Sequence, residues 1–172
     1  MSVPRPRRIL LGAAIVGLLI AGLWLASSSL REPDPAGVPE GAVAYTVERV
    51  VDGDTLVVRD GDDDVRVRLI GIDTPEARPE AECGADAATS RLRELAPDGG
   101  RIWMIGDREP VDRYDRALRY LWTPDGMFVN EALVAEGHAE TLRIPPNTRY
   151  AAALADAERT AKAQALGRWG SC

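Results

Sequence analysis

The sequence predicts an α+β fold: a small closed β-barrel with helices packed on it, preceded by an N-terminal hydrophobic helix. Three observations lead to this prediction. Short β-branched runs end at glycine- and aspartate-rich turns, and hairpin signals join them. The runs occur in the order three strands, one helix, two strands and two helices, which is typical of a small barrel with helical additions. A single unbroken apolar run lies at the N-terminus.

The first three strands follow from short apolar or β-branched runs that end at turn signals. Residues 43–51 are mostly apolar or β-branched and end at an Asp-Gly turn signal. Residues 55–59 continue as a second strand, 60–64 form a hairpin turn, and 65–69 return with a period of two. The aspartates of the turn lack the ligand spacing and closing glutamate of an EF-hand, which favours a solvated turn over a calcium loop.

The remaining elements are separated by proline and glycine. Residues 83–96 favour a helix, which the following Pro-Asp-Gly-Gly stretch ends. An alanine-rich segment with one apolar stripe predicts a long helix near the C-terminus. The predicted strands are 101–105 and 117–122, and the two later helices are 129–137 and 148–166.

The N-terminal segment directs the chain to a membrane. Residues 9–26 form an uninterrupted apolar run of eighteen residues, and residues 1–8 carry three arginines. A spanning helix needs ~20 apolar residues, with a lower limit of about 17. The arginines place the N-terminus in the cytoplasm. The run is either a transmembrane anchor or a cleavable signal peptide. Its length favours the anchor, whereas the small residues that follow would suit a signal peptidase.

Both alternatives leave the rest of the chain outside the cytoplasm, anchored to the cell membrane or secreted. Residues 27–42 are rich in proline, glycine and serine and predict a flexible linker. Residues 43–172 then form one domain of ordinary size. We also expect a monomer.

The chain has two cysteines, Cys83 and Cys172, and both lie in the exported part. In an oxidising compartment an isolated pair is more often bridged than free. We therefore expect a disulfide that ties the C-terminal residue to the region after the second carboxylate turn.

The charge balance excludes general electrostatic binding of duplex nucleic acid. Without the three N-terminal arginines, 18 basic residues oppose 27 acidic ones, a net charge of about −9. Proteins that grip duplexes through their overall field are normally basic. Any attraction for a polyanion must be local, from a few arginines and a bound cation.

Two carboxylates stand at strand ends. Asp54 precedes the second strand, Asp73 follows the third, and Thr74 comes directly after. Two carboxylates and a backbone carbonyl, completed by waters and a phosphate oxygen, would make a Ca²⁺ site. Taken singly, such aspartates more often serve only to form turns.

Neighbouring residues strengthen the interpretation as a site. Pro75 fixes its own φ and biases Thr74 toward extended geometry, so that Glu76 is held near Asp73. Glu76 could orient or deprotonate a water there. Arg68 precedes Asp73 by five residues and could neutralise a phosphoryl group bidentately.

A second charged segment, DRYDR, covers residues 112–116. Arg116 opens a predicted strand, and Arg113 with Tyr114 offers a cation and an aromatic hydroxyl for a terminal phosphate. In isolation this segment would be interpreted as an ordinary charged loop.

From about residue 44 to residue 169 the chain resembles the staphylococcal nuclease (thermonuclease) family. The resemblance is carried by VVDGDTLVV, RVRLIGIDTPE, DRYDRALRY, FVNEALVAEGHA and LGRW, in the family's order. It implies a five-stranded OB-fold barrel with three helices. It also implies a Ca²⁺-dependent phosphodiesterase that hydrolyses DNA and RNA and leaves 3′-phosphates.

The resemblance assigns three groups of site residues. The calcium ligands are Asp54, Asp73 and, through its carbonyl, Thr74. The catalytic residues are the general base Glu76 and the two arginines Arg68 and Arg116. The residues at the nucleotide's terminal phosphate are Arg113 and Tyr114.

The chain departs from the family pattern in three ways. Asp115 stands where glycine is common, and its charge would weaken the field of Arg116. Residues 140–146 lack the tyrosines that line the base pocket of the best-known member, which weakens base stacking. The acidic balance favours single strands. The alternative function is a catalytically weak OB-fold module that binds nucleic acid at the cell envelope.

Overall fold

The computed structural model describes residues 35–77 and 79–172. The predicted N-terminal helix at 9–26, with its basic flank at 1–8, lies outside the described residues. Among the helices of the described part, none has the length and apolar character needed to cross a membrane.

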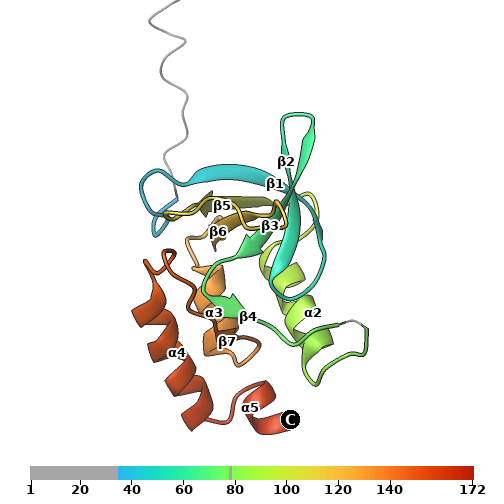
Figure 1. The fold of residues 1–172 in the computed structure, drawn as a ribbon, viewed down its shortest axis with the longest axis vertical. Coiled ribbons are helices and arrows are strands. Elements are labelled where there is room, and N and C mark those ends of the chain that lie inside the picture. The colour runs from blue at the N-terminus through green and yellow to red at the C-terminus, as the bar shows by residue number, and fades with distance from the viewer. Residues whose placement is uncertain (1–34, 78) are drawn as a thin grey trace, which may run out of the picture. The chain divides into compact units, whose positions relative to one another are not determined.

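Five strands form a closed barrel, as the sequence predicts (Figure 1). The strands follow the order β1-β2-β3-β6-β5, and pairing between β5 and β1 completes the circle. Neighbouring strands are antiparallel except for β3 and β6, which run parallel. The bounds are β1 Val43–Val50, β2 Thr55–Asp60, β3 Asp63–Leu69, β5 Arg101–Ile105 and β6 Ala117–Trp122.

The barrel closes around alternating apolar side chains. The core positions of the strands are occupied mostly by valine, leucine or isoleucine, with Met104 on β5 and Ala117 on β6, and a large aliphatic side chain contributes about 1.5–3 kcal/mol when fully buried. The side chains at the centre are almost inaccessible to solvent and include Val47, Leu56, Val67, Ile102 and Leu121. The period of two that the sequence shows at residues 65–69 is found in the burial of β3, whereas β2, β5 and β6 each bury consecutive residues.

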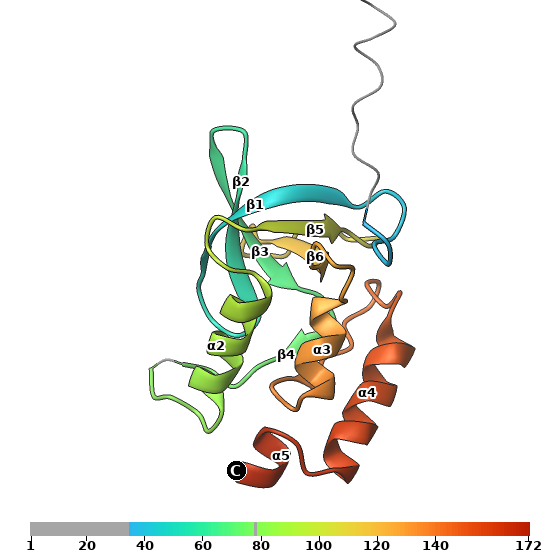
Figure 2. The same ribbon diagram turned by 180° about the vertical axis from the view of Figure 1, so that it is seen from behind.

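Three helices cover the lower end of the barrel (Figures 1 and 2). They are α2 Ala85–Leu95, α3 Val129–Ala135 and α4 Ala151–Ala163, and α3 lies between the other two. A fully buried amide fixes α3 to the barrel: Asn130 accepts a 3.0 Å hydrogen bond from the Leu121 N–H and donates one of 2.9 Å to the Ile70 carbonyl. Removing this amide would leave two buried backbone groups without a partner.

The structure corrects several element boundaries. Strand β3 begins at Asp63 rather than residue 65, because Gly61 has φ 62° and a turn of only two residues suffices. The predicted helices 83–96, 129–137 and 148–166 are each shorter at one or both ends. Part of the predicted linker also packs on the domain, since Ala42 is buried beside Trp103.

Three short elements lack a sequence signal. They are β4 Ile72–Asp73, β7 Glu140–Thr141 and α5 Arg168–Ser171, and each is too short to show a period. Strands β4 and β7 pair antiparallel, with Asp73 opposite Glu140. This ladder attaches the segment that bears Asp73 to the C-terminal half of the chain.

Cys83 and Cys172 form the expected disulfide, with their Cα atoms 5.9 Å apart. The bond attaches the end of α5 to the residue just before α2 begins. The two cysteines are 89 residues apart in the sequence, so the bond restricts a large part of the unfolded chain.

Replacing both cysteines by serine should lower the free energy of unfolding by about 2–4 kcal/mol, since the unfolded chain regains the entropy that the cross-link removes. Urea denaturation of the oxidised wild type, the reduced wild type and the double variant measures this effect. The reduced wild type should match the variant. Equal midpoints for all three proteins would contradict the prediction.

Candidate active site

The Arg68 guanidinium joins the two strand-end carboxylates. Its Nη2 lies 3.0 Å from Asp54 Oδ2 and 2.7 Å from Asp73 Oδ1. Its Nη1 donates hydrogen bonds to the carbonyl oxygens of Leu69 and Ile72, at 2.9 and 2.8 Å. With four partners and a side chain only 12% exposed, Arg68 is held in one orientation.

The barrel register brings these groups together. Thr55 pairs with Arg68 across β2 and β3, and the Leu69 N–H donates to the Asp54 carbonyl at 2.9 Å. The chain then turns at Gly71, with φ 82°, and β4 carries Asp73 back toward Arg68. The positive φ favours glycine there, and a Cβ would also lie 2.6 Å from Leu154 Cδ1, which would have to move.

Asp54 is buried and surrounded by hydroxyl and amide donors. Its Oδ2 accepts hydrogen bonds from the N–H and hydroxyl of Thr74, at 3.1 and 3.2 Å, and its Oδ1 accepts one from Thr55. The preceding Gly53 makes the approach possible, because a Cβ there would lie 2.7 Å from the Thr74 hydroxyl and 2.8 Å from Ala88 Cβ. The Asp-Gly turn thus positions a carboxylate as well as reversing the chain.

Burial raises the pKa of Asp54 from 3.8 to about 6. The Arg68 charge lowers it, the nearby Asp52 raises it further, and hydrogen bonds from Thr74 and Thr55 lower it. The attraction of Arg68 therefore does not fully offset the removal of this carboxylate from water. An additional cation near Asp54 would stabilise its ionised form.

The donor types here suit a hard cation. Asp54 and Asp73 both reach the same Arg68 nitrogen, so their carboxylates converge, and the carbonyl of Thr74 follows directly in the chain. Ca²⁺ takes about 6–8 oxygen ligands. Within residues 35–77 and 79–172, no group of three or more His, Cys, Asp or Glu side chains could hold a metal. Asp54, Asp73 and Thr74 alone supply too few ligands, so they fit Ca²⁺ only when water or a bound phosphate completes its shell.

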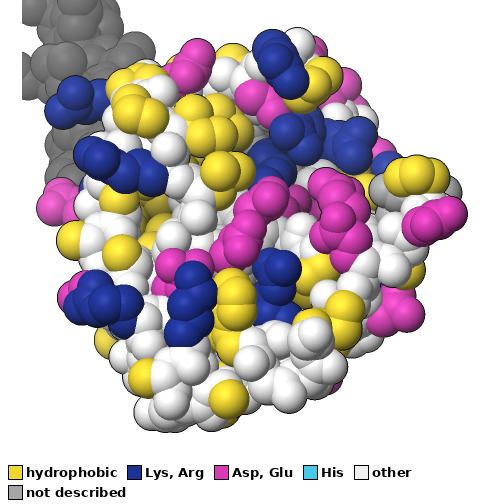
Figure 3. Space-filling view, turned by 60° about the horizontal axis from the view of Figure 1, so that its bottom comes forward, with side chains coloured by type: hydrophobic (Ala, Val, Ile, Leu, Met, Phe, Trp, Pro, Cys, Tyr) yellow, Lys and Arg dark blue, Asp and Glu magenta, His cyan; other side chains and the backbone are white. Residues whose placement is uncertain are grey.

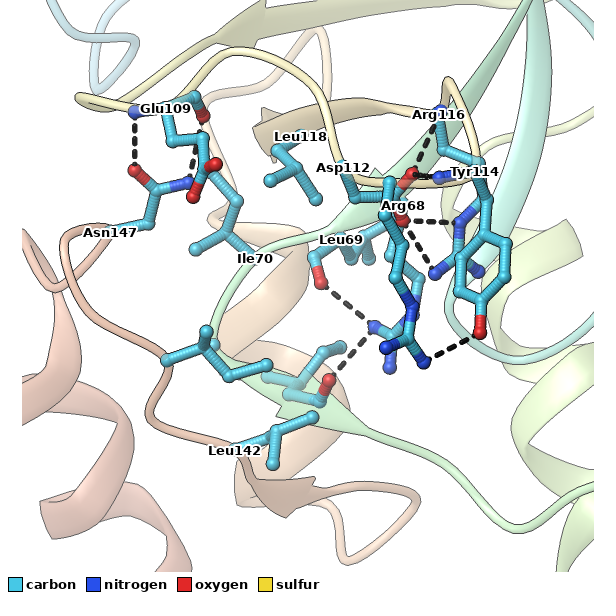
Figure 4. A pocket seen from close by; sticks show the side chains of 14 residues that line it. Arg68, Leu69, Ile70, Glu109, Asp112, Tyr114, Arg116, Leu118, Leu142 and Asn147 are labelled. Carbon is cyan, nitrogen blue, oxygen red and sulfur yellow. Dashed lines mark hydrogen bonds and ion pairs between the residues drawn. The ribbon is translucent and has the colours of Figure 1, made fainter.

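The DRYDR segment folds around Asp112. Its Oδ1 accepts hydrogen bonds from the N–H groups of Tyr114 and Arg116, at 2.9 and 3.0 Å. Its Oδ2 lies 2.7 Å from both Nε and Nη2 of Arg116 (Figure 4). The Arg113 guanidinium lies over the Tyr114 ring and donates to its hydroxyl at 2.6 Å.

Asp112 is a positioning residue that sequence reasoning missed. Burial alone would raise the pKa of its carboxyl, but the hydrogen bonds from Arg116 and Tyr114 outweigh burial and the pKa falls below its ordinary value. An aspartate that bonds the N–H two residues later is typical of an Asx turn. The Asp-x-Tyr spacing in DRYDR could therefore have indicated an Asx turn at Asp112.

One cavity of about 450 Å³ connects the two clusters. The parallel pairing of β3 and β6 sets Arg68 beside Leu118, and Arg116 lies two residues earlier on the same face. Figure 4 shows the arginines, Asp112 and Tyr114 on one side, and Glu109 with Asn147 on the other. The wall between them is aliphatic and includes Ile70, Leu118, Leu142 and Ile144. Leucine and isoleucine thus occupy the 140–146 segment where the sequence lacks tyrosines.

Glu76 is exposed and is not among the residues that line this cavity. Its N–H donates to Glu82 Oε2 at 3.1 Å, and its carbonyl accepts from the Glu82 N–H at 2.8 Å. These bonds fix the backbone of Glu76 three residues after Asp73. Its role as a general base stays a prediction.

Known proteins match this chain over most of the described domain. The family model described as staphylococcal nuclease homologue matches residues 66–171. A thermonuclease of Staphylococcus intermedius is 38% identical over 130 residues, covering 73% of this chain and 76% of that protein. The thermonuclease of Staphylococcus hyicus is 34% identical over 131 residues, or 74% of this chain and 76% of the relative. The chain belongs to the staphylococcal nuclease family.

The endonuclease YncB of Bacillus subtilis is 36% identical over 134 residues, which cover 74% of this chain and 62% of that protein.

Asp115, at the position where the family commonly has glycine, has a positive φ of 62°. The left-handed region favours glycine, and aspartate is among the few other residues that enter it. The carboxylate paired with Arg116 is that of Asp112.

The surface of this staphylococcal nuclease homologue agrees with its acidic composition. Figure 3 shows basic and acidic side chains interspersed over one face, with acidic ones gathered near its centre. Several basic side chains adjoin one another beside these acidic ones, and others stand apart on the same face.

Asp54→Asn should stabilise the chelator-treated protein at pH 7. The folded pKa of about 6 exceeds the ordinary 3.8, so the contribution of Asp54 to stability is complete below pH 3.8 and is lost as pH rises through 6. Full linkage corresponds to about 3 kcal/mol. Urea denaturation between pH 4 and 8 should show the advantage of the variant growing with pH. The exposed control Asp98→Asn should show no such trend, and a pH-independent difference for Asp54→Asn would contradict the prediction.

Asp115→Gly should raise the free energy of unfolding by about 1 kcal/mol, because glycine adopts the left-handed conformation without the Cβ clash. Denaturant titration measures the change. Asp115→Ala removes the same charge but keeps the Cβ and should not stabilise the protein. Equal stabilisation by both variants would assign the effect to charge instead of backbone conformation.

Proposed function

We propose that the chain is a nuclease, a hydrolase of phosphodiester bonds in DNA, RNA or both, and that it requires Ca²⁺. The observation that carries this proposal is the cavity in which Arg68, held between two carboxylates, meets Arg116 and the Arg113–Tyr114 pair. The names of the relatives, thermonuclease and endonuclease, support it.

The two arginines suit the charge that develops on a phosphoryl group. A guanidinium presents paired N–H donors that match two phosphate oxygens. Arg68 is fixed by backbone carbonyls and Arg116 by Asp112, so little reorganisation is needed when charge appears. In this proposal Arg113 and Tyr114 contact the terminal phosphate of the bound nucleotide.

The residues that would hold Ca²⁺ are Asp54 and Asp73 through their carboxylates and Thr74 through its carbonyl. When bound, the ion supplies Lewis-acid polarisation of a phosphoryl oxygen. Burial raises the pKa of Asp54 to about 6, and the charge of an added cation would offset this burial by stabilising the carboxylate.

Glu76 is proposed as the general base. A water would attack phosphorus in line with the leaving 5′ oxygen, and the Glu76 carboxylate would take the proton of that water. The new bond joins the water oxygen to phosphorus, and the bond to the 5′ oxygen breaks. The 5′ oxygen leaves as a hydroxyl after taking a proton from solvent, and the other product carries a 3′-phosphate.

The remaining proposals concern where and on what the protein acts. It would work as a monomer outside the cytoplasm, either anchored by residues 9–26 or secreted after their removal. The net charge of about −9 outside the N-terminal segment favours single strands, which bend into a local site, over duplexes.

One observation favours a second candidate function. Glu76 does not line the cavity, as would be expected of an OB-fold module that binds nucleic acid and cleaves it poorly. Turnover measurements separate this binding module from the nuclease.

Purified protein should cleave single-stranded DNA with Ca²⁺ and not with a chelator. Glu76→Ser and Arg68→Ala should each lower kcat by about 10²–10³, the usual range for a lost base or a lost charge-stabilising donor. Glu80→Ser, an exposed carboxylate nearby in the chain, is the matched control and should leave kcat unchanged.

Ca²⁺ should also raise the melting temperature of the wild type and not that of Asp54→Asn, which gives a readout independent of turnover. If the wild type shows no Ca²⁺-dependent cleavage, the binding module is the better description. Full activity of Glu76→Ser would remove Glu76 from the mechanism.

A further inference from the structure

A second cavity, of about 320 Å³, lies beside the first. Its lining comes from two short segments, one between β5 and β6 and one between β7 and α4. The lining residues are Asp107, Arg108, Pro146, Thr148 and Arg149. The proposed nuclease mechanism uses none of these residues.

The two cavities share one thin wall. Glu109 and Asn147 line the first cavity, while their chain neighbours Arg108, Pro146 and Thr148 line the second. Two 2.8 Å hydrogen bonds join the segments: the Glu109 N–H donates to the Asn147 side-chain oxygen, and the Asn147 amide donates to the Glu109 carbonyl. The two hydrogen-bonded segments therefore line both cavities, each with neighbouring residues.

The carboxylate of the second cavity is turned inward. Asp107 has a side chain only 7% exposed, and its Oδ2 accepts hydrogen bonds from the Arg149 N–H at 3.0 Å and the Tyr120 hydroxyl at 3.4 Å. Burial, and secondarily the Asp107 charge, raise the pKa of Tyr120 to about 12. The Asp107 carboxylate is thus largely engaged in hydrogen bonds to Arg149 and Tyr120.

The two guanidiniums of the cavity make no side-chain hydrogen bond within the described residues, although Arg149 forms a long ion pair with Asp107. Arg149 Nε lies 3.8 Å from Asp107 Oδ1, beyond hydrogen-bonding distance, and the Arg149 side chain is 43% exposed. Arg108 is exposed, and its guanidinium makes no hydrogen bond or ion pair with any residue in the described ranges. Two guanidiniums against one internally bonded carboxylate leave the cavity positive, in a chain that is acidic overall.

We propose that this second cavity binds a phosphodiester group of the same polynucleotide strand whose scissile phosphate lies at Arg68 and Arg116. The proposal rests on the proposed nuclease function and extends its substrate site. Guanidinium forks bind phosphate oxygens bidentately, and the Thr148 hydroxyl adds a donor. A strand that crosses the Glu109–Asn147 wall reaches both cavities, so substrates longer than a dinucleotide bind more tightly.

The first measurement is binding without turnover. Full-length protein, in detergent and chelator, is titrated against a fluorescently labelled single-stranded oligonucleotide of about twelve nucleotides, and anisotropy gives Kd at several salt concentrations. For single strands, each lost phosphate contact reduces the slope of log K against log salt by about 0.7. Arg108→Ala should show this reduction. Arg93→Ala, an exposed arginine on α2 without a described partner, should not.

The second measurement is kinetic. Arg108→Ala should lower kcat/KM for the twelve-nucleotide substrate and leave kcat/KM for a dinucleotide unchanged. An unchanged salt slope, or equal losses on both substrates, overturns the proposal, as does failure of the wild type to bind the oligonucleotide. A wild type that binds with the expected slope change but cleaves neither substrate supports the second cavity and refutes the nuclease.

Discussion

The ion pairs of Arg68 with Asp54 and Asp73 are the interaction on which the site depends. Each carboxylate lies at the end of a different strand, and Arg68 brings them together at one nitrogen. The arrangement exists only because the barrel register sets Thr55 opposite Arg68 and because the chain reverses at Gly71. Fold and site are therefore inseparable here: a one-residue slip between β2 and β3 would turn the Arg68 side chain to the opposite face of the sheet.

The guanidiniums of Arg68 and Arg116 are held in fixed orientations by different kinds of partner. Arg68 is held by backbone carbonyls and by two carboxylates, one just before β2 and one on β4, whereas Arg116 is held by Asp112, four residues earlier in its own loop. Fixing a guanidinium in advance lowers the reorganisation needed when a phosphate oxygen gains charge. A chain that is acidic overall can in this way present positive charge locally, where it is needed.

The sequence predicts the barrel and, apart from Asp112, the residues of both clusters because their signals are local. Alternating valines mark inward positions, and Asp-Gly and Asp-Thr-Pro mark the turns that carry Asp54 and Asp73. The β4–β7 ladder has no such signal, since two residues cannot show a period and their pairing depends on segments far apart in the chain. The cavity wall is unpredictable for the same reason: Glu109 and Asn147 meet only in three dimensions. The raised pKa of Asp54 likewise follows from burial, which no short motif encodes.

The disulfide places the two arginines of the site in covalently different parts of the chain. Cys83 and Cys172 close residues 83–172 into a covalent ring that contains Arg116 and the exposed DRYDR loop, while Arg68 lies on the part of the chain before the ring. A protease that nicks the loop once would open the ring without releasing a fragment, because the two pieces stay joined through sulfur. The same single cut between β2 and β3 would leave only packing and hydrogen bonds to hold the pieces together. After one cut in its own loop Arg116 therefore stays covalently attached to both pieces through the disulfide, whereas after one cut between β2 and β3 Arg68 is held to the other piece only by noncovalent contacts.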